Sequence, residues 1–241
     1  GNDAANVVAH KLGGSIEGFA LQMNKKAKEI DMQNTNFVTP SGLDADEHFT
    51  TAYELALIAK EALANENFAK AAASQTARLC YGNPPYNRTL TNHNKLLKMY
   101  DDIVGVKTGF TKKSGRCLVS ASKKDGKFVI AVTLNDGNDW ADHRTLLDLG
   151  LSLIESKVFS PQKSEVFVWV TDGTRQRVKI PSLTINVTEK SSVDYLIKLP
   201  QFLYAPIKKG QQIGSIKYSC NGNLVSDLPI TAEKDISYKR N

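Results

Sequence analysis

Apolar residues near the start of the chain recur three and four positions apart, the spacing that places them on one face of a helix. The first pattern covers residues 5–12 and ends at Gly13-Gly14, a pair typical of a helix C-terminus, and a second opens at Ser15. A third follows Thr51, which with Glu54 has the form of a capping box, in which hydroxyl and carboxylate satisfy the free N–H groups of a helix start. The sequence therefore predicts three helices within the first 63 residues.

Further along, apolar and polar positions alternate as they do in β-strands. Residues 116–134 are predicted to form two strands around a turn at residues 124–126, and a helix is expected from about Asp139 to Ile154. Beyond Ser160 the alternation continues without a convincing helix, and Asn221-Gly222 marks a tight hairpin turn. We therefore expect two domains, a mixed one of helices and strands over residues 1–158 and an all-β one over residues 159–241.

Composition narrows the class of protein. An apolar share of 41% with 8% aromatic residues can build a core, and no run approaches the roughly 18 apolar residues of a membrane-spanning helix. The net charge of +6 is spread thinly, without blocks of like charge or a nucleic-acid-binding motif, so nucleic acid is not an expected partner. The basic surplus fits either a plain solvated surface or attraction to an anionic wall polymer or membrane surface.

Cysteine and histidine spacing predicts neither a disulfide scaffold nor a metal site. The three cysteines have no metal-ligand spacing, and Cys117, in an apolar strand-like run, is expected to be a buried free thiol. The four histidines show no ligand spacing and no acidic partner, so surface or loop roles are expected. Because the phosphate-cradling glycine patterns are also missing from the sequence, a nucleotide-dependent enzyme is not expected.

One tripeptide suggests chemistry. Lys107-Thr108-Gly109 follows an apolar run and precedes the two predicted strands, a setting that suits the edge of a sheet. An ammonium group, a hydroxyl and a residue without a side chain would together recognise a substrate carboxylate and let its backbone lie close. On spacing alone, a strand end with a polar turn fits the tripeptide equally well.

Five segments, in the order found in the family, resemble the D-alanyl-D-alanine carboxypeptidases, the low-molecular-mass penicillin-binding proteins of the serine β-lactamase/transpeptidase superfamily. They are GNDAAN (residues 1–6), NFVTPSGLD (36–44), TTAYELALIA (50–59), GVKTGFT (105–111) and LYAPIKKG (203–210) with Gly214. The superfamily signature comprises S-x-x-K, a Ser-x-Asn element and K-T-G. The resemblance implies an α+β transpeptidase-like catalytic domain, with helices and an antiparallel sheet, that is incomplete here and is followed by a small β-sandwich.

The resemblance also assigns catalytic roles. Family members form an acyl-enzyme through the S-x-x-K serine, with its lysine as base, and water then releases the product. Asn2 would be the amide of the Ser-x-Asn element, contacting that lysine and the substrate amide. Lys107 would set the electrostatics around the Ser-x-Asn serine. The backbone N–H of Phe110 would form half of the oxyanion hole, although the family often has histidine at this position.

Substrate recognition is assigned by the same resemblance. Lys107 and Thr108 would hold the carboxylate of a D-Ala-D-Ala stem peptide or of a β-lactam, and Gly109 would keep the strand edge open. Thr111 would belong to the same group of substrate-binding residues. Arg144, which does not sit cleanly at the family position, is the nearest candidate for the carboxylate-binding arginine and fits an exposed helix charge equally well.

The nucleophile itself is not expected among these residues. Ser120 and Lys123 fit S-x-x-K but lie in a predicted strand, where they would point to opposite faces, and Ser160 with Lys163 lies in the predicted interdomain linker. Ser219-Cys220-Asn221 fits Ser-x-Asn but belongs to the later hairpin. We therefore expect that the chain lacks the N-terminal part of its catalytic domain, begins just after the Ser-x-Asn serine, and is inactive alone.

The resemblance implies an extracytoplasmic parent enzyme that trims peptidoglycan stem peptides, is acylated by β-lactams, and needs the missing N-terminal segment of the same protein. Such parents are often tethered by a C-terminal amphipathic helix, which implies peripheral membrane association. Two alternatives remain: a β-lactamase, against which the β-rich second domain argues, and a non-catalytic cell-wall-binding fragment.

Overall fold

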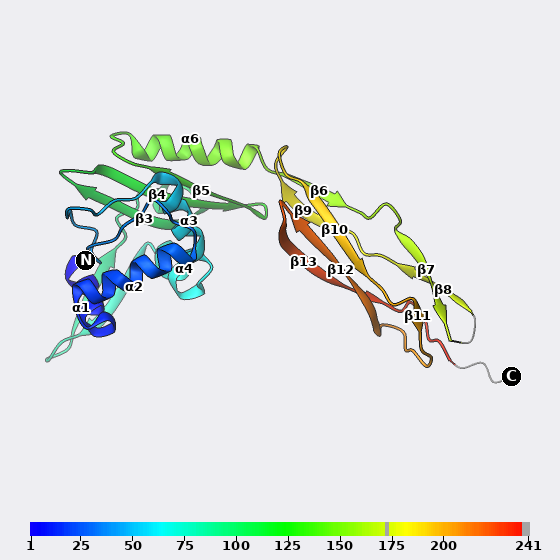
Figure 1. Ribbon diagram of the computed structural model, residues 1–241. Coiled ribbons are helices and arrows are strands. Elements are labelled where there is room, and N and C mark those ends of the chain that lie inside the picture. Colours follow the sequence, from blue (N-terminus) through cyan, green and yellow to red (C-terminus); the bar gives the residue numbers. More distant parts are fainter. Residues whose placement is uncertain (172–173, 238–241) are drawn as a thin grey trace. The chain divides into compact units, whose positions relative to one another are not determined.

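In the computed structural model, which describes residues 1–171 and 174–237, the chain divides into two units, Gly1–Ser152 and a second beginning at Leu153 (Figure 1). The first combines helices with an antiparallel sheet, and the second is built from strands, as expected for the fold class. Each unit contains its own clusters of buried apolar side chains. Of the helices in the described residues, none has the length and apolar character needed to cross a lipid bilayer.

The three predicted N-terminal helices are confirmed. The first two are α1 (Asn2–Gly13) and α2 (Ile16–Glu29). Between them Gly14 takes the left-handed conformation at φ 75°, which glycine adopts without steric cost, and the Ser15 hydroxyl accepts a hydrogen bond from the Gly18 N–H at 2.9 Å. The third, α3 (Ala52–Leu63), begins where the Thr51 hydroxyl accepts a bond from the Glu54 N–H at 3.2 Å.

The role expected for the Glu54 carboxylate in the capping box is wrong. The Glu54 carboxylate is buried and accepts hydrogen bonds from the Asn34 backbone N–H at 2.7 Å and from the Thr35 hydroxyl. Burial raises the pKa of Glu54, but the hydrogen bonds from Thr35 and Asn34 outweigh this effect and hold the pKa below its ordinary value. A buried carboxylate needs such donors, so Glu54 joins α3 to the loop before it instead of capping its own helix.

The sheet of the first unit has the order β3-β4-β5, from β3 (Ile103–Thr111), β4 (Gly115–Lys124) and β5 (Lys127–Thr133). The turn at residues 124–126 is therefore confirmed, and β3 forms an edge. Helix α6 (Asp139–Ser152) covers one face, where Leu118 and Leu147 are buried, and α3 covers the other, where Ala59 packs with Ala121 (Figure 1). The pleat of β4 explains this division, since residues an odd number apart point to opposite faces.

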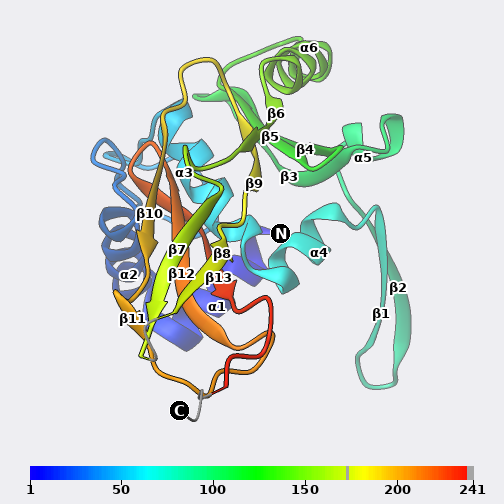
Figure 2. The ribbon, with the colours of Figure 1, turned by 90° about the vertical axis from the view of Figure 1, so that its right-hand side faces the viewer.

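The hydrophobic pattern does not predict the elements between residues 66 and 99. They are α4 (Glu66–Ala73), β1 (Thr76–Tyr81), β2 (Tyr86–Thr91) and the single turn α5 (Leu96–Met99). Strands β1 and β2 pair antiparallel as a ribbon that projects from the unit (Figure 2), and every one of their residues is exposed. Without a buried face the ribbon leaves no alternating signal in the sequence.

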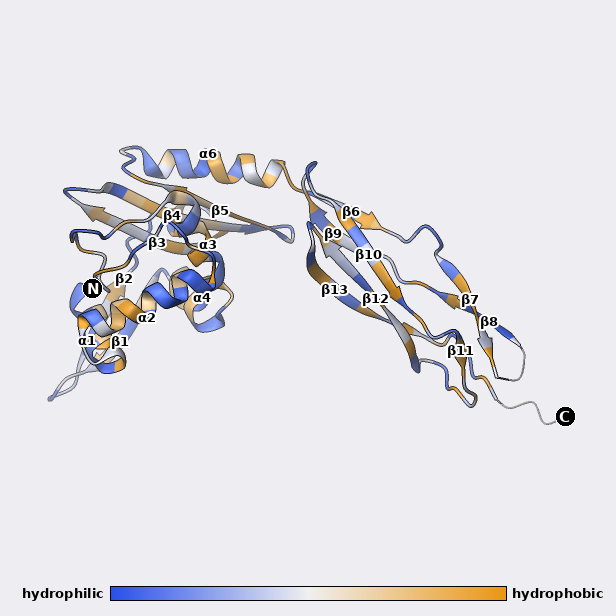
Figure 3. Cartoon of the chain, in the orientation of Figure 1, coloured by the Kyte–Doolittle hydropathy of each residue, from blue (hydrophilic) through white to orange (hydrophobic). Residues whose placement is uncertain are grey.

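The second unit contains three small sheets: β10-β12-β13, β11-β7-β8 and β6-β9. Its strands are β6 (Glu155–Phe159), β7 (Glu165–Val170), β8 (Arg175–Lys179), β9 (Leu183–Val187), β10 (Val193–Lys198), β11 (Phe202–Leu203), β12 (Gln212–Cys220) and β13 (Asn223–Thr231). Apolar and polar residues alternate along several of these strands (Figure 3). The inward positions, among them Ile216, Tyr218 and Ile230, are fully buried.

Pairing between β6 and β9 places the segment after residue 154 in the second unit. The Ser160–Lys163 pair therefore lies between β6 and β7, inside this unit, and its expected position in an interdomain linker is wrong. The hairpin at Asn221-Gly222 joins β12 to β13 as predicted, and it contains the Ser219-Cys220-Asn221 match.

Candidate active site

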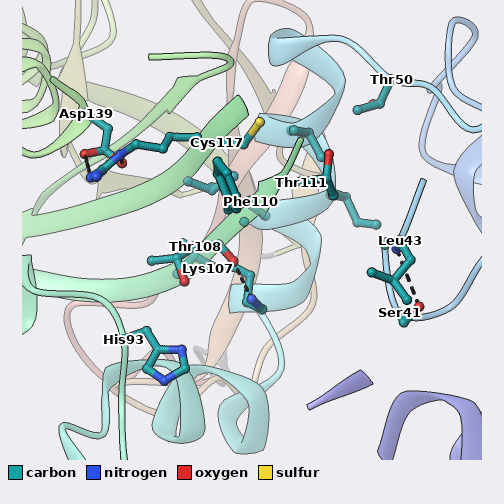
Figure 4. Close-up of a pocket in the computed structure, with 18 of the residues that line it drawn as sticks. Ser41, Leu43, Thr50, His93, Lys107, Thr108, Phe110, Thr111, Cys117 and Asp139 are labelled. Atoms are coloured by element: carbon teal, nitrogen blue, oxygen red, sulfur yellow. Dashed lines mark hydrogen bonds and ion pairs between the residues drawn. The ribbon is translucent and has the colours of Figure 1, made fainter. Parts of the chain in front are cut away.

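A cavity of about 910 Å³ opens in the first unit beside the β3 edge. Its walls come from the start of α1, the loop before α3, one face of α3, the start of α4, the segment before α5, strands β3 and β4, and the start of α6. Figure 4 shows Lys107, Thr108 and Phe110 of β3 at its centre, between Asp139 on one side and the Ser41–Leu43 loop on the other. The sequence-predicted tripeptide therefore faces a space large enough for a peptide substrate.

Lys107 and Thr108 both line this cavity. Lys107 is exposed, and its ammonium group donates to the backbone carbonyl of Thr108, which draws the charge close to the strand (Figure 4). Thr108 is half-buried and its register partner is Leu118 on β4. An ammonium group and a hydroxyl thus lie on neighbouring residues of an edge strand, where an anionic group can meet both.

Gly109 is not required by the packing of the protein. A Cβ built at this position would meet only Cys117, at an ordinary contact distance of 3.8 Å, and the backbone is not in the left-handed region. The missing side chain instead leaves the cavity side of β3 open, as expected for a strand that a substrate backbone approaches.

Phe110 and Thr111 extend the cavity-lining row. The Phe110 side chain is 71% exposed, an unusual position for a large apolar group next to an open cavity. The Thr111 hydroxyl accepts a hydrogen bond from the Ser114 N–H at 2.9 Å and so stabilises the turn between β3 and β4. Asn2, at the first turn of α1, is exposed and also lines the cavity. The structure therefore brings Asn2 and residues 107–111 together.

Arg144 is not brought to this cavity. Its guanidinium group binds Asp102, with Nη1 3.0 Å from Oδ1, and Asp148, and it lies 4.9 Å from the centre of the Tyr100 ring. Burial raises the pKa of Asp102, but the hydrogen bonds from Ser122 and Arg144 outweigh this effect and hold the pKa below its ordinary value. With its donors engaged by Asp102, just before β3, and by Asp148 of α6, Arg144 links α6 to that segment and does not line the cavity.

Arg116 is the cavity arginine that sequence reasoning missed. Its guanidinium group binds Asp139 through two nitrogens, with Nε 3.1 Å from Oδ2, and lies 5.6 Å from the centre of the Trp140 ring. The hydrogen bond with Asp139 raises the pKa of Arg116, and Asp139 itself is only 4% exposed. The register of the β3–β4 hairpin is the signal that could have identified Arg116, because it pairs with Phe110, the residue that follows the tripeptide on β3.

The cavity is positively charged. Lys95, Lys107 and Arg116 line it, whereas among its lining residues, all within the described part of the chain, Asp139 is the one carboxylate. Because that carboxylate is already paired with Arg116, the surplus positive charge is available to an anionic ligand.

The loop opposite β3 is closed by a bridge between Asn36 and Phe49. Within it, His48 Nδ1 accepts hydrogen bonds from the backbone N–H groups of Val38, at 3.0 Å, and Thr39, at 3.2 Å. Burial lowers the pKa of His48, an effect that Asp44 opposes. The expected loop role for a histidine is confirmed at this position, where the unprotonated ring shapes the cavity wall.

Two expectations about side chains are corrected here. His143 has neither a surface nor a loop role: it is fully buried, with Nδ1 2.5 Å from the Ser120 hydroxyl and Nε2 3.0 Å from the Thr133 hydroxyl, and burial lowers its pKa. Cys117 is half-buried and lines the cavity, because it lies on the face of β4 opposite to the one that buries its neighbour Leu118.

The S-x-x-K match in β4 does not contribute to the cavity. Ser120 is fully buried against His143, whereas Lys123, at the other end of the pair, is exposed. The described residues contain no group of three or more histidine, cysteine, aspartate or glutamate side chains that could hold a metal ion. What the cavity offers is a cationic, hydroxyl-bearing strand edge that can bind and orient a carboxylate-bearing chain.

Comparison with known proteins identifies relatives of both units. Residues 1–138 match a family described as D-alanyl-D-alanine carboxypeptidase, and residues 154–238 match the C-terminal domain of penicillin-binding protein 5. The chain is 31% identical over 246 residues to D-alanyl-D-alanine carboxypeptidase DacF of Bacillus subtilis, covering 98% of the chain and 63% of that protein. It spans about three fifths of the length of the first curated relatives it matches.

Solved structures agree with this assignment. The carboxypeptidase DacD of Francisella tularensis is 25% identical with a TM-score of 0.59, over 99% of this chain and 73% of that one. The peptidoglycan synthesis regulatory factor PBP3 of Streptococcus pneumoniae shares the fold with a TM-score of 0.72 at 20% identity, over 98% of this chain and 73% of that one. With a matching family model over more than half of its length, this chain belongs to the D-alanyl-D-alanine carboxypeptidase family of penicillin-binding proteins.

Proposed function

We propose that this protein is a serine-type D-alanyl-D-alanine carboxypeptidase that trims peptidoglycan stem peptides and is acylated by β-lactams. The observation that carries the proposal is the cationic cavity along β3, where Lys107 and Thr108 lie beside an open strand edge at Gly109. A peptide ending in D-Ala-D-Ala presents a terminal carboxylate and a short extended backbone, which are the two features this edge suits. β-Lactams present a carboxylate to the same groups.

Arg116 completes carboxylate recognition in this proposal, in the role that the sequence resemblance suggested for Arg144. Its guanidinium group is held by Asp139 and remains 41% exposed at the cavity, so one side of it is free to meet an anion. Lys107 would contribute charge, Thr108 a directed hydrogen bond, and Thr111 a wall of the same subsite. Arg116, Lys107 and Thr108 would together fix the terminal D-Ala before reaction.

The reaction requires a nucleophile that we place in a Ser-x-x-Lys segment outside these 241 residues. Its serine oxygen would attack the carbonyl carbon of the penultimate D-Ala while its lysine takes the proton. The nitrogen of the terminal residue would gain a proton and leave as free D-Ala, and water would hydrolyse the resulting ester. Asn2 would orient that lysine and the substrate amide, and the Phe110 N–H would stabilise the oxyanion. No metal or organic cofactor enters this scheme.

Peptidoglycan lies outside the cytoplasm, so the proposal places the protein there, as an extracytoplasmic enzyme associated peripherally with the membrane. The positive surplus of the chain supports this environment, since the envelope polymers and lipids it would meet are anionic. A stem peptide and β-lactams are the proposed binding partners.

The proposal is tested on the protein with its Ser-x-x-Lys segment included, using fluorescent penicillin and a pentapeptide ending in D-Ala-D-Ala. We expect a long-lived covalent adduct and release of D-Ala. Rapid hydrolysis of the β-lactam would instead identify a β-lactamase. If neither adduct nor D-Ala release is found, the protein is a wall-binding module, and the enzyme proposal fails.

The arginine assignment has its own matched pair of variants. Arg116→Gln combined with Asp139→Asn removes the cation without leaving a buried unpaired carboxylate, and we expect kcat/KM to fall about 10- to 100-fold, mainly through KM. The control is Arg144→Gln combined with Asp102→Asn, which we expect to leave kcat/KM nearly unchanged. A pentapeptide ending in an amide should show no penalty for the Arg116 pair, and an equal loss with both pairs would refute the assignment.

A further inference from the structure

The outer face of the β11-β7-β8 sheet in the second unit carries large apolar side chains that the described residues of that unit leave exposed. Along β7 the inward residues Val168 and Val170 enter the core, whereas Phe167 is 66% and Trp169 is 41% exposed. On β11, Phe202 pairs with Trp169 in the parallel register and is 52% exposed. Strands β7, β8 and β11 lie side by side in Figure 2. Solvent-facing aromatic groups thus form one continuous row.

Basic side chains run beside that row. The antiparallel register of β7 with β8 sets Arg175 opposite Trp169, Arg177 opposite Phe167, and Lys179 at the next outward position. The guanidinium carbon of Arg175 lies 4.2 Å from the centre of the Trp169 ring. We call this surface the aromatic–basic face, which comprises Phe167, Trp169, Phe202, Arg175, Arg177 and Lys179.

Charge is distributed unevenly between the two units. From residue 153 onward the sequence contains 13 Lys and Arg against 8 Asp and Glu, so five of the six surplus positive charges fall in the second unit. On the aromatic–basic face, Glu165 forms an ion pair with Arg177, and Lys179 lies 3.4 Å from Glu233. Arg175 lies over the Trp169 ring and forms no ion pair with a carboxylate of the described residues, so its charge can meet an external anion.

We propose that the aromatic–basic face docks on the surface of an anionic phospholipid bilayer. Phe side chains bury apolar area at the boundary between headgroups and acyl chains, Trp favours the same depth, and Arg attracts lipid phosphates. A sugar polymer fits less well, because the Arg175 guanidinium covers one face of the Trp169 ring and the phenylalanines offer sugars no polar atom. The occupant is therefore a membrane of negative surface charge.

The test uses the 241-residue chain and sedimentation with vesicles of equal parts phosphatidylglycerol and phosphatidylethanolamine. We expect binding to these vesicles and little binding to pure phosphatidylcholine, and we expect it to weaken as salt rises from about 0.1 M to about 0.5 M. Phe167→Ser with Phe202→Ser should lower the partition coefficient at least about tenfold. Arg175→Gln with Arg177→Gln should lower it about fivefold per arginine.

Matched controls remove the same kind of side chain elsewhere in the second unit. Leu224→Ser with Val225→Ser deletes two exposed apolar groups of β13, and Lys190→Gln with Lys198→Gln deletes two charges. We expect the apolar control to bind like the parent chain and the charge control to lose clearly less than the arginine pair. The proposal is overturned if each control weakens vesicle binding as much as its partner, or if the chain binds insoluble peptidoglycan but not vesicles. Since neither assay involves turnover, their outcome is independent of the proposed enzyme activity.

Discussion

Gly109 illustrates what single residues contribute to the site. Its neighbours Lys107 and Thr108 supply charge and a hydroxyl, and the glycine supplies space, since Cys117 is the nearest contact for an added Cβ and lies 3.8 Å away. An alanine at this position therefore strains nothing within the protein, and its methyl group would stand where the proposed substrate backbone approaches β3.

Replacing Gly109 with alanine should separate stability from function. We expect an unchanged or slightly higher melting temperature, because alanine lowers the entropy of the unfolded chain. Acylation by labelled penicillin, measured on the protein with its Ser-x-x-Lys segment, should slow on the order of 10- to 100-fold. Gly137→Ala, at an open position that does not line the cavity, is the control and should acylate normally. Normal acylation of the Gly109 variant would exclude close backbone approach.

The arginines show how far residue-scale prediction reaches. The tripeptide could be found from sequence because its three members are adjacent in the chain. The choice between Arg116 and Arg144 could not, because it depends on which partner captures each guanidinium group. Asp139 holds Arg116 at the cavity, and Asp102 with Asp148 holds Arg144 away from it.

At the scale of elements, the loop between α2 and α3 forms a wall of the cavity through local hydrogen bonds. His48 accepts from the Val38 and Thr39 N–H groups, and Glu54 anchors the start of the loop through Asn34 and Thr35. Such a segment has no periodic spacing of apolar residues from which it could be predicted. The helices on either side could be predicted because their apolar spacing and caps are local signals.

Acid should loosen this loop. Burial lowers the pKa of His48 from its ordinary value of about 6.5, so the folded state favours the neutral ring. The stabilisation it provides is complete above about pH 6.5 and is lost as the pH falls toward the lowered value, where Nδ1 gains a proton and can no longer accept. We expect hydrogen-exchange protection factors of Val38 and Thr39 to fall as the pH is lowered from about 6.5. Amides in the middle of α2 are the control, and constant loop protection would contradict the mechanism.

At the scale of the whole molecule, each unit has its own hydrophobic interior, made of two clusters in the first unit and one in the second. Leu147 belongs to one cluster of the first unit and Ile216 to that of the second, and both are completely buried. The change from helical to alternating apolar spacing predicts a division of this kind. The exposed ribbon of β1 and β2, in contrast, buries no face and has no pattern from which it could be predicted.

Core substitutions should act on one unit at a time. We expect Ile216→Ala to destabilise the second unit by about 2–5 kcal/mol and Leu147→Ala to do the same to the first. Each should lower one of two transitions in differential scanning calorimetry and leave the other in place. A single transition that both substitutions shift equally would show that the two cores unfold together.

The sequence by itself determined the helices with local apolar spacing and caps, the strands with alternating positions, the two-part organisation and the Lys107-Thr108-Gly109 strand. These depend on neighbours a few residues apart, whose geometry the backbone dictates. Only the tertiary structure decided which arginine meets the cavity, that Glu54 and His143 are buried, and that aromatic and basic rows share one sheet face. Such outcomes depend on strand register and on contacts between residues far apart in the chain, because burial and charge pairing are set by what lies opposite in space.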